Sequence, residues 1–232
     1  MVVGATPLAL VHSPLVGPGT WHRAAELLER QGWPCTVPDL TPSLRAGPPF
    51  AARQLARVLE CAGERGAVVV GHSGAGPLVA RAAGASDGFA GCVLVDAMLP
   101  SPGAPWRATA PRDLDERLGE LAHDGWLPPW PQWWEPGELE ALLVDPAVRA
   151  AFVADCPPLP VAMLDEPQPA GVRWREARGA YLQLSEGYGD EAAAARDLGW
   201  PVLERSGHHL WLLTDPERVV DPLLELVAAL VR

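Results

Sequence analysis

The residues best suited to chemistry in this sequence begin with a serine in a glycine-rich bend. Ser73 lies in the motif GHSGA (residues 71–75), between the apolar run 67–70 and an alanine-rich stretch with a helical pattern. An uninterrupted apolar run of this length predicts a buried parallel strand. Ser73 is therefore expected on a tight strand–turn–helix bend, where small neighbours let the two backbones approach and the hydroxyl stands clear as a nucleophile. The alternative is a serine that only caps the following helix.

A serine nucleophile needs a base within hydrogen-bond reach and a third group that fixes the base. His208 follows the last predicted strand and should arrive at the same sheet edge as Ser73. His12 and His72 leave strands on that side too, so topology alone excludes neither. His72 should point away from Ser73 because side chains alternate along a strand.

Strands alternating with amphipathic helices predict a parallel sheet covered on both faces. Strands are expected at 8–12, 35–37, 67–70, 92–95, 180–185 and 201–204, and helices from about 20, 50, 75 and 190. A Pro-rich loop is expected over 38–49. Because of Pro222, the C-terminal segment is expected to break near Asp221 before a last helix.

The pattern changes between Pro100 and about Pro160, where no strand is predicted and tryptophans crowd together. Helices are expected near 113–122 and 138–154. We interpret residues 1–99 and 158–232 as one core and residues 100–157 as an inserted helical lid. Tryptophans of this insertion could line a pocket or form a local packed core; those assigned to a substrate pocket are Trp130, Trp133 and Trp134.

Composition excludes several classes of function. The 232-residue chain carries a formal charge of −11, which argues against nucleic acid or an anionic membrane as partner. All 18 of its basic residues are arginine, so lysine-based chemistry is excluded. The four cysteines form no C-x-x-C pair, which indicates free thiols and no metal. With neither a signal peptide nor a membrane span recognised at the N-terminus or elsewhere, a cytoplasmic monomer or homodimer is expected.

The strand order, the GHSGA bend, the Trp-rich insertion and the segment GHHLWLLTDPE together resemble the α/β-hydrolase family over essentially the whole chain. The segments VHSPLVGPGTWHRAAELLERQGW and PDL are similar to the opening of small plant esterases and hydroxynitrile lyases. The resemblance implies a three-layer α/β-hydrolase fold of about six mostly parallel strands with an inserted helical lid. It also implies Ser73 as nucleophile and His208 as base, with His209 a packing or loop residue.

The resemblance leaves the acid and the oxyanion hole open. The acid is Asp96, after the strand that follows the bend, or Glu186, since Gly187 stands where the usual aspartate would align. One oxyanion donor is the Gly74 N–H. The second aligns with Pro14, which has no N–H, so Leu15 is expected to supply it through a shifted loop.

These features predict a cofactor-independent serine hydrolase that cleaves a small-molecule ester or thioester of a bulky apolar or aromatic acyl group through an acyl-enzyme. The absence of lysine excludes a Lys-assisted hydroxynitrile lyase. Two alternatives remain. One is a lyase or cyclase that uses the same Ser/His pair on a natural-product intermediate, and the other is a ligand-binding protein that has lost turnover.

Overall fold

The core of the protein is a six-stranded parallel sheet built from both halves of the chain. A computed structural model describes residues 6–62, 66–85, 87–109, 112–168 and 173–232. Within it the strand order is β2-β1-β3-β4-β7-β8, with every neighbouring pair parallel. The strands are β1 (Leu8–Val11), β2 (Cys35–Thr36), β3 (Val68–Ser73), β4 (Gly91–Ala97), β7 (Gly179–Gln183) and β8 (Val202–Glu204). The predicted fold class is confirmed.

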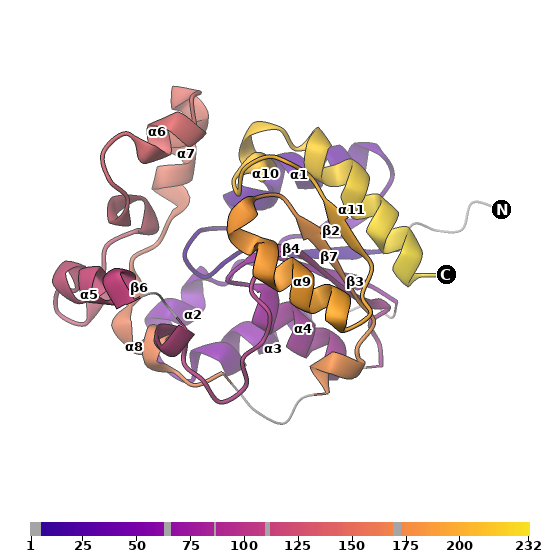
Figure 1. Ribbon diagram of the computed structural model, residues 1–232, viewed down its shortest axis with the longest axis horizontal. Coiled ribbons are helices and arrows are strands. Elements are labelled where there is room, and N and C mark those ends of the chain that lie inside the picture. The colour runs from indigo at the N-terminus through magenta and orange to yellow at the C-terminus, as the bar shows by residue number, and fades with distance from the viewer. Residues whose placement is uncertain (1–5, 63–65, 86, 110–111, 169–172) are drawn as a thin grey trace.

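Helices cover both faces of this sheet (Figure 1). Successive strand residues point to opposite faces, and both faces are apolar: Leu8 and Leu10 pack on one side, Ala9 and Val11 on the other. Helices on the first face are α1 (Gly19–Arg30) and α11 (Glu217–Leu230), and those on the second are α3 (Phe50–Ala62), α4 (Gly76–Ala85) and α9 (Gly189–Asp197). Burial on both faces explains why the strands appear in the sequence as continuous apolar runs.

The segment between β4 and β7 lies largely outside the main sheet (Figure 1). Its elements are η1 (Trp106–Thr109), α5 (Arg112–Leu121), β5 (Trp126–Leu127), η2 (Trp130–Trp133), α6 (Glu138–Leu142), α7 (Pro146–Asp155), β6 (Leu159–Pro160), α8 (Val161–Asp165) and η3 (Trp174–Glu176). The expectation of no strand here is wrong, because β5 and β6 form a two-stranded antiparallel sheet. The helix expected over 138–154 is two helices, since Asp145 caps a new start at Pro146.

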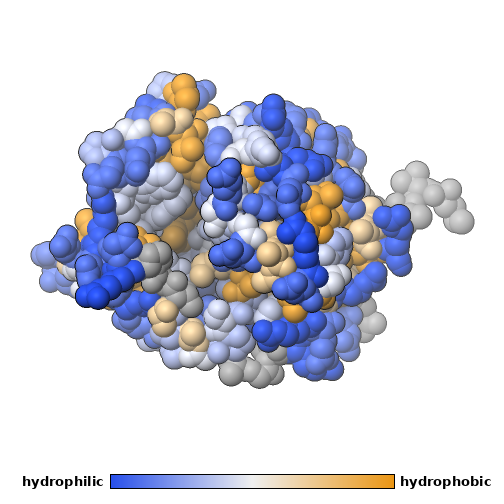
Figure 2. All heavy atoms as spheres, in the orientation of Figure 1, coloured by the Kyte–Doolittle hydropathy of each residue, from blue (hydrophilic) through white to orange (hydrophobic). Residues whose placement is uncertain are grey.

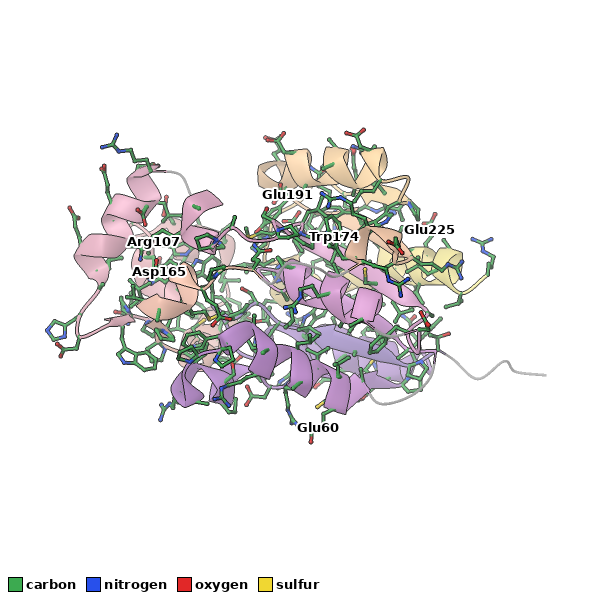
Figure 3. All side chains as sticks on the ribbon, turned by 90° about the horizontal axis from the view of Figure 1, so that it is seen from below. Glu60, Arg107, Asp165, Trp174, Glu191 and Glu225 are labelled. Carbon is green, nitrogen blue, oxygen red and sulfur yellow. The ribbon has the colours of Figure 1, made fainter. Side chains whose placement is uncertain are left out.

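Polar contacts fasten this segment internally and to the core. Arg107 pairs with Asp115 at 2.6 Å and with Asp165 at 2.8 Å, which joins η1 to α5 and α8 (Figure 3). At the end of α7, the Asp155 carboxylate accepts the Gly19 N–H at 2.8 Å, at the first turn of α1. Whether the segment moves as a lid, with the boundaries given above, stays a prediction.

Two expectations about prolines are wrong. The loop predicted over 38–49 contains α2 (Thr41–Ala46), whose first turn accommodates Pro42. Pro222 does not break α11, which runs uninterrupted to Leu230. A proline inside a helix costs about 3 kcal/mol, but α11 buries seven side chains, Pro222 included, and each large apolar one contributes about 1.5–3 kcal/mol. Burial therefore outweighs the lost hydrogen bond.

The remaining elements connect the sheet to the candidate site: η4 (Glu186–Tyr188) follows β7, and α10 (Trp211–Thr214) follows β8. Cys92 and Cys156 are buried free thiols as expected, whereas Cys35 and Cys61 are only partly buried. No helix among the described residues is long and apolar enough to span a membrane. The expectation for the extreme N-terminus concerns residues 1–5, which lie outside the described residues.

Candidate active site

Ser73 sits on the sharp bend between β3 and α4, as the motif predicted. Its φ of 57° is in the left-handed region, which costs energy for a side chain other than glycine. The bend depends on small neighbours. A Cβ on Gly71 would lie 2.6 Å from a methyl carbon of Val79, and one on Gly76 would lie 2.0 Å from the Met98 carbonyl oxygen. Strand and helix backbones can therefore approach, and the bend exposes the serine at the carboxyl edge of the sheet.

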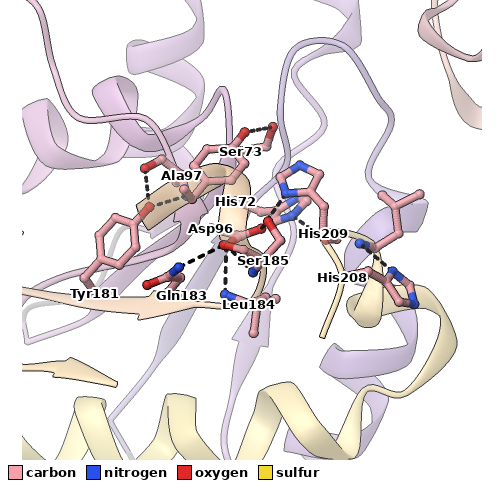
Figure 4. Close-up of polar contacts among 12 residues, drawn as sticks. His72, Ser73, Asp96, Ala97, Tyr181, Gln183, Leu184, Ser185, His208 and His209 are labelled. Atoms are coloured by element: carbon pink, nitrogen blue, oxygen red, sulfur yellow. Dashed lines mark hydrogen bonds and ion pairs between the residues drawn. The ribbon is translucent and has the colours of Figure 1, made fainter. Parts of the chain in front are cut away.

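Asp96 and His209 form a buried pair beside Ser73 (Figure 4). The His209 Nδ1–H donates to Asp96 Oδ2 at 2.8 Å, and the two side chains are 17% and 0% exposed. With its proton on Nδ1, the neutral imidazole keeps an unprotonated Nε2, which is the tautomer that a general base requires. His209 and Ser73 line the same small cavity.

Asp96 is held as a carboxylate by donors from the end of β7. Its Oδ1 accepts the N–H groups of Leu184 and Ser185 at 2.8 and 3.0 Å, and its Oδ2 accepts the Ser185 hydroxyl at 2.6 Å. Burial alone would raise the pKa of Asp96, but the hydrogen bonds from His209, Ser185 and Leu184 outweigh it and lower the pKa. Asp96 therefore meets a histidine as predicted, whereas the alternative acid, Glu186, is exposed at the start of η4.

The structure corrects the choice of histidine. His208, the predicted base, turns away from Asp96 and joins the start of α10. Its Nδ1 accepts the Leu210 N–H at 3.2 Å, its Nε2 contacts the Thr214 hydroxyl at 3.2 Å, and its ring packs on Trp211. His209, the next residue along the chain, takes the position beside Asp96 that was expected of His208.

Two further aromatic rings contact His209, and neither was predicted to do so. Tyr188 stacks on the His209 ring at 5.0 Å between centroids, and its hydroxyl lies 3.4 Å from Ser73 Oγ. In this structure Ser73 Oγ thus has a weak polar contact with the Tyr188 hydroxyl. The His72 Nε2–H donates to the His209 carbonyl at 3.0 Å, and burial, together with His209, lowers the pKa of His72 to about 3. A neutral His72 therefore fixes the backbone of His209.

Sequence gave partial signals for these partners. His72 was expected to point away from Ser73 because side chains alternate along a strand. The same alternation directs the His72 ring toward the backbone of His209. His12 is the other histidine that topology allowed. Its Nε2 accepts the Leu40 N–H at 3.1 Å and its Nδ1–H donates to the Ser13 backbone carbonyl at 2.8 Å, so its role is structural. Tyr188 lies in the stretch searched for an acid, but nothing in its spacing marks it.

The expected oxyanion hole has one donor in place. The Gly74 N–H, directly after Ser73, donates to no group in the part of the chain that the structure describes. Pro14 has no N–H, and the Leu15 N–H, the predicted second donor, is directed at Ser13 Oγ at 3.3 Å. Ser13 Oγ itself lies 2.9 Å from the position of a Cβ built on Gly74. The group beside Gly74 is thus the Ser13 hydroxyl, which the sequence did not single out.

Two cavities meet at this point. The larger, of about 120 Å³, is mainly apolar and is bordered by Gly74, Ser13, Leu78 and Trp106. The smaller contains Ser73, His209 and Trp130. Figure 2 shows a hollow between the surface formed by α5 to α7 and that formed over the sheet.

Of the tryptophans assigned to a substrate pocket, the structure brings Trp130 to the small cavity, with Trp134 packed edge-on against it at 4.9 Å. Trp133 is buried in a hydrophobic cluster, where its Nε1–H donates to the Pro128 carbonyl at 2.8 Å. Trp133 therefore packs the segment and borders neither cavity. Within the described residues, no group of three or more His, Cys, Asp or Glu side chains is arranged to hold a metal.

Comparison with known proteins agrees with this fold. A search of curated proteins finds no match. Similar solved structures include an extracellular alpha/beta-hydrolase from a Paenibacillus species, described as sharing structural and functional homology with tobacco salicylic acid binding protein 2 (16% identity, TM-score 0.75, 95% of this chain and 98% of that one). Another is a tomato methylketone synthase I variant with β-ketoheptanoate (15% identity, TM-score 0.75, 97% of this chain and 99% of that one). A third is a polyneuridine aldehyde esterase variant (16% identity, TM-score 0.72, 96% of this chain and 99% of that one).

At these identities, the likeness to solved structures shows the fold alone. The family assignment comes from a sequence model described as the alpha/beta hydrolase family, which matches residues 8–221. That match includes Ser73, Asp96, His208 and His209. The chain belongs to the alpha/beta hydrolase family.

Proposed function

We propose that this protein is a serine hydrolase that cleaves an ester or thioester of an apolar or aromatic acyl group through an acyl-enzyme. Ser73 is the nucleophile, His209 the base and Asp96 the acid that orients it. The reaction needs no cofactor, because these three groups and two hydrogen-bond donors supply everything that acyl transfer requires.

In the first half of the reaction, His209 Nε2 takes the proton of the Ser73 hydroxyl while Ser73 Oγ bonds to the substrate carbonyl carbon. The carbonyl oxygen becomes an oxyanion, to which the Gly74 N–H and the Ser13 hydroxyl donate. Expulsion of the leaving alcohol or thiol, protonated by His209, gives the acyl-enzyme. In the second half, water attacks the acyl carbon while His209 Nε2 takes its proton; the bond to Ser73 Oγ then breaks, His209 returns the proton to Oγ, and the acid product leaves.

The observation that carries the proposal is the 2.8 Å hydrogen bond between His209 Nδ1 and the fully buried Asp96, beside a serine on a strained bend. For attack, Ser73 Oγ has to exchange its 3.4 Å contact with Tyr188 for one with His209. That contact is long for a hydroxyl pair. Such rearrangement is ordinary, since catalytic hydrogen bonds often tighten only when substrate binds.

A fluorophosphonate labelling experiment with the neighbouring histidines as matched variants tests this proposal. The parent should gain one adduct, on Ser73 by peptide mass spectrometry, and should hydrolyse p-nitrophenyl esters. His209→Gln should lose both activities by several orders of magnitude, whereas His208→Gln should keep them within a few fold. Failure of the parent to label and hydrolyse would overturn the proposal; loss in His208→Gln with retention in His209→Gln would overturn the assignment of the base.

A second candidate is a lyase or cyclase in which Ser73 and His209 move protons without an acyl-enzyme. Two observations favour it: Ser73 contacts the Tyr188 hydroxyl, and Pro14 removes the backbone donor that efficient esterases use. Burial raises the pKa of Tyr188 to about 12, although its contact with Ser73 acts in the opposite direction, so this phenol stays protonated at neutral pH. Rapid conversion of a substrate to an isomerised product, without release of an acid, would support this candidate.

A further inference from the structure

The larger cavity contains a cation, Arg81, that forms no ion pair with any residue the structure describes. Arg81 lies on α4, one turn beyond Pro77, and both line this cavity together with Gly74. Side chains four residues apart share one face of a helix, so the face of α4 that begins at the nucleophile bend continues to Arg81. The axial rise from Gly76 to Arg81 is roughly 7–8 Å.

Arg81 is partly buried and its hydrogen-bonding groups are not all used. Its Nε is buried without a partner, and no described residue forms an ion pair with its guanidinium. Burial lowers the pKa of Arg81, with nearby Glu166 acting against this, yet an arginine stays charged at neutral pH. A partly desolvated charge without a partner is costly unless something compensates it.

Glu166 lines the same cavity and its charge acts on Arg81, but its carboxylate oxygens already have other hydrogen-bond partners. Its two oxygens accept the Phe50 and Ala51 N–H groups at 2.7 and 2.8 Å, at the start of α3. This is a typical position for an anion, because the N-terminus of a helix carries free donors and a partial positive charge. Glu166 is thus held by α3 and leaves the guanidinium of Arg81 available to a ligand.

The two halves of a substrate must lie on different sides of Ser73. His209 has to protonate the leaving group, and His209 lines the smaller cavity with Trp130. The acyl half therefore extends to the other side, past Gly74 and into the cavity that contains Arg81. At about 120 Å³, that cavity suits a group near the size of a benzene ring, which occupies an engineered cavity of about 150 Å³.

We propose that Arg81 binds an anionic group at the far end of the acyl half, so that the preferred substrates are monoesters or monothioesters of compact dicarboxylic acids. The apolar wall takes the body of the acyl group, and the planar guanidinium takes its free carboxylate by paired hydrogen bonds. This inference rests on the proposed hydrolase function and adds the charge of the substrate to it.

Two p-nitrophenyl esters of the same shape test this inference: the ester of 4-carboxybenzoic acid and that of 4-carbamoylbenzoic acid. They differ at the far end only in charge. The parent should favour the carboxylate in kcat/KM by about tenfold or more, as a charge-assisted hydrogen bond implies. Arg81→Gln should abolish this preference, Arg81→Lys should retain part of it, and Arg57→Gln, on the outer side of α3, should leave it intact.

The outcomes distinguish failure of the Arg81 inference from failure of the proposed hydrolase function. Equal turnover of both esters by the parent, or a preference that survives Arg81→Gln, would overturn the inference and leave the hydrolase intact. Turnover of neither ester, without labelling of Ser73, would overturn the hydrolase. In that case, calorimetric binding of terephthalate by the parent, lost in Arg81→Gln, would still support the anion site, and its absence would overturn that site too.

Discussion

Replacing Ser13 by alanine should slow the reaction without preventing the protein from folding. Ser13 is 2% exposed, and its Oγ lies beside Gly74, whose N–H is the proposed first oxyanion donor. Loss of one such donor costs 10²- to 10³-fold in kcat, or about 2.7–4 kcal/mol. The substitution also frees the Leu15 N–H from its 3.3 Å bond with Ser13, so that it can partly replace the lost hydroxyl. We therefore expect the lower end of this range, about 100-fold.

The position of Pro14 supplies an internal rescue. Pro14→Ala restores a backbone N–H where the proline has none, so the double variant Ser13→Ala/Pro14→Ala should recover a substantial part of the rate lost by Ser13→Ala. A merely structural role for Ser13 predicts no such recovery. Ser43→Ala is the matched control, because it removes a partly buried hydroxyl that bonds to the Leu40 carbonyl, away from both cavities at Ser73.

Steady-state hydrolysis of a neutral p-nitrophenyl ester measures the effect. The loss in Ser13→Ala should appear in kcat with KM nearly unchanged, since the donor acts on charge that develops in the transition state. Affinity for a boronic acid, which mimics the tetrahedral intermediate, should fall in parallel, with thermal unfolding showing that the fold is kept. A decrease in kcat of less than about threefold would refute the role of Ser13. An increase in KM with kcat unchanged would refute it as well.

Three further tests, two of them with a matched control variant, concern other parts of the site and the bend. Asp96→Asn should reduce kcat by about 10³- to 10⁴-fold, because the tautomer of the base is no longer fixed, whereas Glu186→Gln should change kcat little; the reverse would reassign the acid. In the folded protein the pKa of His72 is about 3, against an ordinary 6.5. Between pH 3 and pH 6.5, His72 therefore binds fewer protons in the folded protein than in the unfolded chain. The free energy of unfolding should therefore fall by roughly 1.4 kcal/mol per pH unit as the pH drops through this window, and His72→Gln should flatten that slope in urea titrations. Gly76→Ala should destabilise the fold by about 1–3 kcal/mol, because its Cβ would meet the Met98 carbonyl at 2.0 Å, whereas Gly119→Ala, with open space around it, should be neutral or stabilising.

The sheet could be predicted from sequence because burial on both faces leaves a local signature. Each central strand is a short apolar run, and the bend at Ser73 adds small residues at the two positions where backbones must approach. The place of Asp96 at this edge was predictable for the same reason, since it ends such a run, although the sequence left Glu186 open as the alternative acid. Side-chain periodicity and strand order are enough to bring these groups to one edge.

The choice between His208 and His209 could not be predicted, because it depends on the conformation of a loop. Both residues follow β8, and a shift of one position decides which ring reaches Asp96. Nothing in the periodicity of a loop specifies this shift. It depends on contacts with distant segments, since His72 holds the His209 backbone and Asp96 bonds to its ring, and on local contacts of His208 with Leu210 and Thr214.

The insertion was harder to predict than the core, and for a related reason. Strands β5 and β6 are two residues each and contain or adjoin prolines, so they show no strand pattern, and only their pairing with each other makes them strands. Helix α11 shows the opposite case, where a local signal was overruled. Pro222 indicates a break, but burial against the sheet keeps the helix continuous.

The contact between Asp155 and the start of α1 constrains how a substrate can enter. A Cβ on Gly17 would lie 2.3 Å from the Asp155 carboxyl carbon, so the two chain segments touch there without space for even a methyl group. Gly17 and Gly19 continue the same loop that carries Ser13 and Pro14. A displacement of α7 that widened the entrance would therefore pull on the strand-to-helix connection that carries Ser13, the proposed second donor, and access and catalytic alignment would be mechanically linked.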